Sequence, residues 1–346
     1  MKFTKLMGAA SVMALATTAF AQDAELLVFD YSGFEMPEYH QAYIDQHGAS
    51  PTFTFFGDED EAFQKIRAGF RADVSHLCAP SVTRWTDSGI LEPWDTSRIT
   101  AYGDLNASLT GEEIGAGQTY FIPTDFGSTA IAYNPEQVSE EDVATLQVFT
   151  NPAFAGRMTL PDNVDDAYAL AYLATGVTNW QNVTDEEFEA ASNWLRAVHP
   201  NLRTYWTDPA ELSQLLASGE ILVSWAWNET YPAMVEEGRP IAFQREAVEG
   251  SSLWLCGYVK LAGGQGNVDK AYDYLNAFLS EESVVPLLEA GYGSANAVAL
   301  DAQVSDEDLI ASGLGEIDAP ILAQLPKSNE MREKHAEMFE MIKAGF

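Results

Sequence analysis

The stretch ELLVFDYSGF at residues 25–34 decides the fold, because a short apolar run here ends in a turn. Residues 25–30 have the length and composition of a buried strand, and Gly33 belongs to the turn that follows. Working outward, the sequence predicts further strands at 52–56 and 72–77 and helices at 37–46 and 60–68. Strands that alternate with helices indicate an α/β fold with a mostly parallel sheet.

The loops after these strands are candidate binding loops, because ligands of open α/β sheets lie at the carboxyl ends of the strands. The sequence then predicts a loop at 120–123, strands at 127–134, 157–160, 221–225 and 253–261, and helices at 166–175, 185–198, 209–218, 268–279, 281–290 and 330–343. No Ser/Pro-rich linker divides the chain. Two domains would therefore be interwoven, with the chain crossing between them more than once.

Composition excludes several classes of protein. The 346 residues carry a formal net charge of −34, with 47% hydrophobic and 12% aromatic residues. Such a chain can bury a core, which excludes wholesale disorder. It lacks the clustered Lys and Arg that nucleic acid and anionic membranes require. The acidic surplus fits the surface of a soluble protein, such as one adapted to a saline habitat, or a field that attracts a cationic ligand.

Residues 1–21 have the pattern of a cleaved signal peptide. Lys2 and Lys5 precede an apolar stretch over 6–16, and Ala19-Phe20-Ala21 matches the small-residue cleavage pattern. No later apolar stretch is long enough to span a bilayer. We therefore expect a mature chain from about Gln22, located in a bacterial periplasm.

Motifs for catalysis or for a cofactor are absent from the sequence. There is no glycine-rich phosphate loop and no nucleophile elbow. The five histidines show no metal-ligand spacing, and the acidic run at 58–61 fits a helix start better than a cation site. We expect no metal and no cofactor. A secreted glycosidase or lyase stays an alternative, because the many acids allow carboxylate pairs anywhere.

Four tryptophans lie where predicted strands meet loops: Trp206, Trp225, Trp227 and Trp254. Aromatic side chains dominate hydrophobic cores, so core packing is one explanation. The other is an aromatic cage, in which indole faces attract ammonium or sulfonium groups by roughly 0.5–2 kcal/mol each.

Six segments together resemble the spermidine/putrescine-binding branch of the solute-binding proteins of bacterial ABC importers. They are residues 29–34 (FDYSGF), 73–81 (DVSHLCAPS), 123–134 (PTDFGSTAIAYN), 218–228 (SGEILVSWAWN), Trp254 and Tyr292. The resemblance covers nearly the whole mature chain. Each motif is weak alone, whereas six in order are fairly specific.

This resemblance implies a two-lobe periplasmic binding protein fold, type II-like, with interwoven lobes that close at a hinge. Lobe one would be 22–131 plus 255–302, and lobe two 132–254 plus 303–346. The resemblance implies that the protein is not an enzyme. We expect a monomer that delivers a solute to an inner-membrane ABC permease, or a sensor of the same fold. The resemblance also places Cys78 and Cys256 close together in one lobe, which favours a disulfide.

The resemblance further implies a set of ligand-binding residues: Tyr31, Ser32, Ser81, Asp125, Asp166, Trp206, Trp225, Trp227, Trp254 and Tyr292. Three acids of the family are missing, because Gly33, Ala169 and Cys256 stand at their positions. Buried primary ammonium groups need acceptors for their N–H groups, whereas quaternary ammonium or sulfonium heads need none. We therefore expect a cationic or zwitterionic onium solute, of the betaine or dimethylsulfoniopropionate type, with putrescine or spermidine as the alternative. Ser32, Ser81, Ser128 and Thr129 are candidate donors to a ligand carboxylate.

Overall fold

One 12-stranded sheet organises the described residues, 22–106 and 118–346, in a computed structural model. Its main strand order is β2-β1-β3-β10-β5-β8-β6-β7. The strands are β1 (Gln22–Tyr31), β2 (Ser50–Phe56), β3 (Val74–Cys78), β4 (Leu91–Glu92), β5 (Phe121–Tyr133), β6 (Met158–Pro161), β7 (Leu202–Trp206), β8 (Val223–Trp227), β9 (Ala242–Gln244), β10 (Ser251–Leu261), β11 (Gly293–Ser294) and β12 (Ile321–Ala323). The predicted signal peptide lies outside the described residues.

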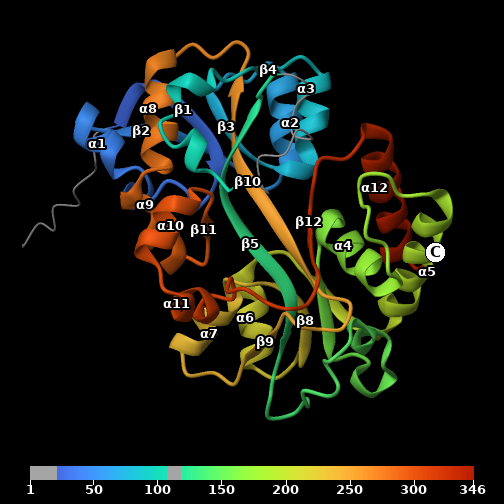
Figure 1. Cartoon of the computed structure of the whole chain (residues 1–346). Coiled ribbons are helices and arrows are strands. Elements are labelled where there is room, and N and C mark those ends of the chain that lie inside the picture. The colour runs from blue at the N-terminus through green and yellow to red at the C-terminus, as the bar shows by residue number, and fades with distance from the viewer. Residues whose placement is uncertain (1–21, 107–117) are drawn as a thin grey trace, which may run out of the picture.

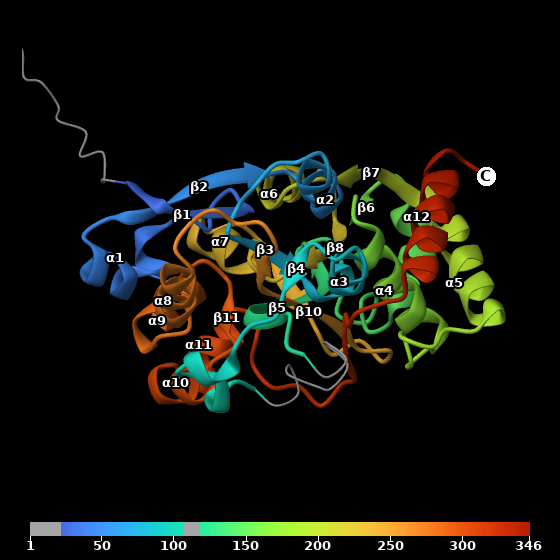
Figure 2. The same ribbon diagram turned by 90° about the horizontal axis from the view of Figure 1, so that it is seen from above.

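Helices follow most of the strands and cover the sheet (Figures 1 and 2). They are α1 (Gln41–His47), α2 (Glu59–Arg67), α3 (Val82–Asp87), α4 (Val164–Thr175), α5 (Asp185–Val198), α6 (Pro209–Ala217), α7 (Thr230–Glu236), α8 (Val268–Phe278), α9 (Glu281–Glu289), α10 (Ala297–Gln303), α11 (Asp306–Ala311) and α12 (Asn329–Lys343). In the described part of the chain, no helix combines the length and the hydropathy needed to cross a membrane.

Two long strands, β5 and β10, run through both halves of the molecule (Figure 1). They pair antiparallel from Ser252 opposite Thr129 to Val259 opposite Phe121, with a bulge between Cys256 and Gly257. On one side β10 pairs with β3, and on the other β5 pairs with β8. These two strands therefore join the halves.

Each half has its own apolar core. One core gathers side chains of β1, β3, α3 and α8 with Phe121 and Ile122 of β5. The other gathers side chains of β6, α4, α5 and α12 with Ala130 and Ile131 of β5. Figure 2 shows α5 and α12 at the opposite end of the molecule from α1. We propose that the two cores correspond to the two lobes, with the bounds given above.

The alternation of strands and helices is as predicted, and the α/β fold class is confirmed. The prediction of a mostly parallel sheet was wrong, because the two long strands β5 and β10 pair antiparallel with each other and with β8 and β3. Two local predictions were wrong. Residues 120–123, predicted as a loop, mostly belong to β5, because the Pro123 position lies at the β10 bulge where a proline is tolerated. Tyr205 and Trp206, predicted in a loop, end strand β7, which pairs parallel to β6.

A disulfide joins Cys78 at the end of β3 to Cys256 on β10, as the family resemblance implied. The two residues are opposite each other in the antiparallel pair of these strands. Cys256 is also opposite Asp125 of β5, so the disulfide lies beside that carboxylate position. It ties the amino-terminal strands to a strand that comes 178 residues later.

We expect reduction of this disulfide to lower the free energy of unfolding by about 2–5 kcal/mol, because the bond closes a long loop in the unfolded chain. Urea unfolding with and without a reductant measures the difference. A Cys78→Ser/Cys256→Ser protein is the control, in which the reductant should change nothing. Equal stability of the oxidised and reduced wild-type protein would contradict a stabilising role.

Candidate functional site

Most of the predicted ligand residues lie near β5 and β10, where elements of both halves meet. Tyr31 ends β1, Ser81 lies in the short helix η2 (Ala79–Ser81), Asp125 lies on β5, Asp166 lies in the first turn of α4, Trp227 ends β8, Trp254 lies on β10, and Tyr292 precedes β11. Tyr31 and Trp227 thus lie at strand ends, as the α/β pattern predicts, whereas Asp125 and Trp254 lie within the two long strands.

Asp166 is buried and held by side chains from other elements. Its Oδ1 accepts hydrogen bonds from Thr129 (3.1 Å) and Gln324 (2.8 Å), and its Oδ2 accepts one from the indole N–H of Trp227 (2.8 Å). Asn163 caps α4 and accepts the backbone N–H of Asp166. Burial raises the pKa of Asp166 to about 6, although these three side-chain hydrogen bonds act in the opposite direction.

Asp125 is fully buried and keeps one oxygen without a partner. Its Oδ1 accepts a hydrogen bond from Thr124 (2.7 Å) and lies 3.0 Å from Nε2 of His76, whereas no protein group reaches Oδ2 among the described residues. After burial itself, negative charge that includes Asp125 raises the pKa of both Tyr39 and Tyr292. The Asp125 carboxylate is therefore within electrostatic reach of these two phenol groups.

Glu229 is a third acid in this region and directly follows the β8 strand and Asn228. Burial, and then the charge of Asp166, raise the pKa of Glu229 to about 8. Glu229 in turn contributes to the raised pKa of Tyr39, about 12, and of Tyr292. Glu229 is therefore within electrostatic reach of Asp166, and both Glu229 and Asp125 are within electrostatic reach of Tyr39 and Tyr292.

The predicted tryptophans divide into two groups. Trp227 and Trp254 are partly buried, and Trp254 stands edge-on to Tyr292 with ring centroids 6.0 Å apart. Trp206 and Trp225 have no exposed surface, and Trp206 packs edge-on against Trp227 at 4.7 Å. The second pair has the burial of core residues, so direct ligand contact by Trp206 and Trp225 stays a prediction.

Tyr31 and Ser81 converge on Glu59, the first residue of α2. The Tyr31 hydroxyl donates to Glu59 at 3.0 Å, the backbone N–H of Cys78 donates at 2.6 Å, and the Ser81 hydroxyl also donates to it. Burial raises the pKa of Glu59 to about 7. Ser32 lies in an exposed turn and is not brought to this group.

Ionic and polar contacts join α12 to the other half of the molecule. Arg332 is paired with Asp165 of α4 at 3.1 Å and lies 3.7 Å from Asp60 of α2. Asn329 donates a hydrogen bond to Asp87 of α3 at 3.0 Å. These contacts hold the two halves against each other on the side of the molecule where α2, α3 and α12 lie.

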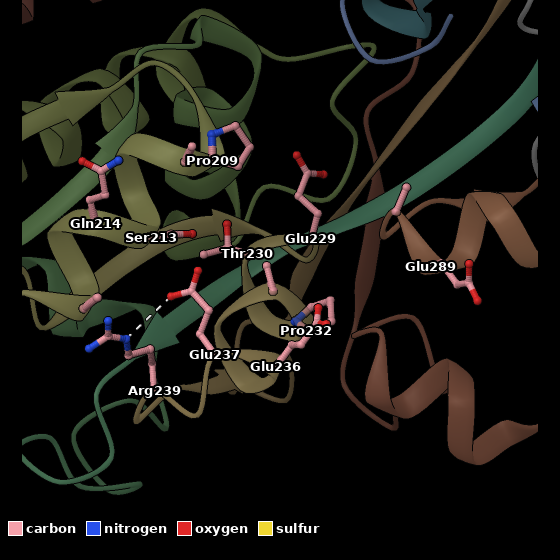
Figure 3. Close-up of a pocket in the computed structure, with 14 residues that line it drawn as sticks. Pro209, Ser213, Gln214, Glu229, Thr230, Pro232, Glu236, Glu237, Arg239 and Glu289 are labelled. Atoms are coloured by element: carbon pink, nitrogen blue, oxygen red, sulfur yellow. Dashed lines mark ion pairs between the residues drawn. The ribbon is translucent and has the colours of Figure 1, made fainter. Parts of the chain in front are cut away.

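A cavity of about 600 Å³ opens beside Glu229, between α6, α7 and the end of α9 (Figure 3). Its wall carries further acids, Glu236, Glu237 and Glu289, and one arginine, Arg239, which lies 3.6 Å from Glu237. Proline and alanine side chains form much of the rest. The cavity therefore offers a negatively charged opening beside Glu229.

Three residues of the region were not predicted from sequence: Glu59, His76 and Gln324. Glu59 stands in the acidic run at 58–61, which correctly predicted a helix start and so masked any other role. His76 and Gln324 belong to no spacing motif, and only the folded chain brings them to Asp125 and Asp166. Within the described ranges, no group of three or more His, Cys, Asp or Glu is placed to hold a metal ion.

Comparison with known proteins gives consistent matches. The family described as "Bacterial extracellular solute-binding protein" matches residues 38–311. The spermidine/putrescine-binding periplasmic protein of Escherichia coli is 23% identical over 305 residues, 86% of each chain. The gamma-aminobutyric acid-binding protein of Pseudomonas aeruginosa is 24% identical over 254 residues, 70% of this chain and 67% of the other.

A solved structure shows the same fold. The spermidine/putrescine ABC transporter substrate-binding protein of Streptococcus pneumoniae superposes with a TM-score of 0.75 at 16% sequence identity. The match covers 93% of this chain and 99% of that one.

We expect Gly127→Ala to displace the indole of Trp254, because a methyl group on Gly127 would overlap that ring across the β5–β10 pair. The cost should be about 1–3 kcal/mol of stability, as for other overpacked sites. Urea unfolding and near-UV circular dichroism measure both effects. Gly103→Ala is the control, since nothing lies within 4 Å of the added methyl group. A loss of stability for Gly127→Ala as small as that for Gly103→Ala would contradict the contact between Gly127 and Trp254.

Proposed function

Because the chain belongs to the bacterial extracellular solute-binding protein family, we propose that it captures a small organic cation between its two lobes. The chain is a non-enzymatic substrate-binding component of an ABC importer, similar to spermidine/putrescine-binding proteins. Family membership sets aside the secreted glycosidase or lyase. We place the protein in the periplasm as a monomer, with a membrane permease as its partner.

The grouping of Asp125, Asp166 and Glu229 carries the proposal of a cation. Three acids in one region favour positive charge there, and of the basic side chains described above only His76 contacts one of them, at Oδ1 of Asp125. Trp227, Trp254 and Tyr292 add aromatic faces, which attract cations more strongly where water is excluded. Charge and aromatic surface thus support the same class of ligand.

The head group that fits best carries N–H donors. Oδ2 of Asp125 is a buried carboxylate oxygen without a partner, and an ammonium N–H would satisfy it. Relatives named for spermidine, putrescine and gamma-aminobutyric acid bind solutes with such groups. Amines and polyamines are therefore our first candidates.

The hydroxyl groups predicted to hold a ligand carboxylate are engaged elsewhere. Ser81 donates to Glu59, Ser128 donates to the Gly313 carbonyl at 2.7 Å, and Thr129 donates to Asp166. This favours a cation without a carboxylate over a zwitterion.

A quaternary ammonium or sulfonium solute, of the betaine or dimethylsulfoniopropionate type, is the second candidate. Both oxygens of Asp166 already have protein partners, Ala169 is buried, and Cys256 is in the disulfide, so these positions offer no free acceptor. The indole N–H of Trp254 is buried without a partner and would serve a ligand carboxylate. These observations support the onium solute as the second candidate.

Titration calorimetry against putrescine, spermidine, gamma-aminobutyric acid, choline, glycine betaine and dimethylsulfoniopropionate tests the proposal. We expect the amines to bind more tightly than the onium solutes. Trp227→Ala and Trp254→Ala should each lose at least about tenfold in affinity, or 1.4 kcal/mol. The partly buried Trp194 on α5 gives the control, Trp194→Ala, which should bind normally. Absence of binding to any of these solutes would contradict the proposal, and the reverse order would favour the onium candidate.

Cation binding should release a proton from Glu229 near neutral pH. In the empty protein the pKa of Glu229 is about 8, so the group is largely protonated at pH 7. A cation stabilises the carboxylate and lowers this pKa, so affinity should rise from pH 6 to pH 8 and level off above. Putrescine titrations at pH 7 in phosphate and in Tris buffer measure the released proton.

Glu229→Gln should abolish that proton release and flatten the pH profile. Glu289→Gln is the matched control, because Glu289 is an exposed acid of the same cavity. Identical profiles for the wild-type protein and Glu229→Gln would show that Glu229 does not face the cation.

A further inference from the structure

A histidine of β3, His76, is buried between two aspartates of neighbouring strands. Its Nδ1 lies 2.9 Å from Oδ1 of Asp30 on β1, and its Nε2 lies 3.0 Å from Oδ1 of Asp125 on β5. All three side chains have at most 1% of their surface exposed. We call this group the Asp30–His76–Asp125 clamp; Figure 1 shows β1, β3, β10 and β5 side by side.

The geometry fits a doubly protonated imidazole ring at His76. An ionised carboxylate only accepts hydrogen bonds, and a carboxylate oxygen lies within hydrogen-bond distance of each ring nitrogen. A proton on each ring nitrogen would satisfy both contacts. Burial opposes the positive charge of such a ring, but Asp125 and Asp30 outweigh it and raise the pKa of His76 to about 10.

Packing fixes the imidazole ring in place. His76 stacks on Tyr258, its cross-strand neighbour on β10, with centroids 4.7 Å apart and an interplanar angle of 14°. Phe34 stands edge-on to it at 4.4 Å, and Tyr31 at 5.8 Å. The ring cannot turn away from either aspartate without disturbing these contacts.

The far end of the clamp is fully hydrogen-bonded. Oδ1 of Asp30 accepts the backbone N–H of Tyr31 at 2.8 Å besides facing His76, and Oδ2 accepts the Tyr258 hydroxyl at 2.7 Å. Tyr258 in turn is 2.8 Å from the hydroxyl of Tyr274. Asp30 therefore has no free oxygen for any other group.

The near end of the clamp is incomplete. Oδ1 of Asp125 is engaged by His76 and by Thr124, whereas Oδ2 is buried and has no partner. An unpartnered buried carboxylate oxygen costs free energy, so natural proteins rarely keep one without a function. Within the clamp, Oδ2 of Asp125 is thus the one carboxylate oxygen left for a group from outside.

We propose that His76 is a positioning residue that holds Asp125 with Oδ2 directed at the ligand, and so makes the site prefer cations that carry N–H donors. This rests on the proposed function. Oδ1 is engaged by His76 and Thr124, so rotation of the carboxylate group would break both of these contacts. Oδ2 is therefore the oxygen that remains for the ligand. A primary ammonium donates to the fixed oxygen, whereas a trimethylammonium head has no N–H to donate.

The protonation state of His76 is the first test, and it needs no ligand. With ¹⁵N-labelled histidine, the NMR signals of His76 should show protons on both ring nitrogens up to pH 8.5. His40 is the internal control: it is equally buried and lies 2.7 Å from Ser50 rather than from a carboxylate, and burial lowers its pKa to about 4. His40 should therefore be neutral. A His76 ring with a single N–H at pH 7 would overturn the clamp.

Ligand selectivity is the second test. Putrescine and its fully N-methylated bis(trimethylammonium) analogue are the probes, and the wild-type protein should prefer putrescine at least tenfold. His76→Gln keeps a hydrogen-bond donor but loses the charge and the second donor, and should reduce this preference below threefold. His40→Gln should leave the preference unchanged. A His76→Gln protein with wild-type preference would overturn the proposal.

A third measurement works even if His76→Gln does not fold. Putrescine added to the wild-type protein should shift the Nε2–H signal of His76, since both contact the same carboxylate, and leave His40 unaffected. Putrescine that binds without moving the His76 signal would also overturn the proposal. If neither probe binds, the proposed function fails at its head-group chemistry, while the NMR state of His76 decides the clamp separately.

Discussion

The antiparallel pairing of β5 with β10 is the constraint on which the rest of the structure depends. It is the connection that both apolar cores share, and it sets the register of the site. Trp254 lies opposite Gly127 in this pair, and Cys256 lies opposite Asp125. A slip by one residue would turn these side chains to the other face of the sheet. The positions of Trp254 and Asp125 are therefore both set by the backbone hydrogen bonds of this one strand pair.

Strand β10 also explains how a histidine two strands away reaches Asp125. Gly257, which has no side chain, follows Cys256 on β10, and Tyr258 supplies a flat surface for the imidazole ring. The disulfide holds the same part of β10 against β3. At the position where the family resemblance implied an acid, this chain thus has a covalent tie, and Asp125 lies opposite it on the neighbouring strand.

Sequence patterns predicted the fold well because apolar periodicity and turn residues are local signals. The family resemblance also named Asp125, Asp166 and Trp254, which the structure places near β5 and β10, and ligand contact by these residues stays a prediction. Sequence patterns failed for His76 and Gln324, whose partners are supplied by chain crossings that no local pattern records. The tryptophans were a mixed case: the same junction pattern marks Trp227, which is partly exposed, and Trp225, which is fully buried. Position in a strand cannot distinguish a wall of a site from the core behind it.

The net charge of −34 is a poor guide to recognition, because the acids of the site are balanced individually. Burial of three ionised carboxylates without partners would cost much free energy of folding. Asp166 is stabilised by three side-chain hydrogen bonds, Asp125 by an imidazolium, and Glu229 by its own proton at neutral pH. Of these three, only the protonation of Glu229 is readily reversed near neutral pH. On the proposed function, a cation that enters replaces a proton at Glu229 and donates to the unpartnered Oδ2 of Asp125, while the hydrogen bonds of Asp166 stay as they are.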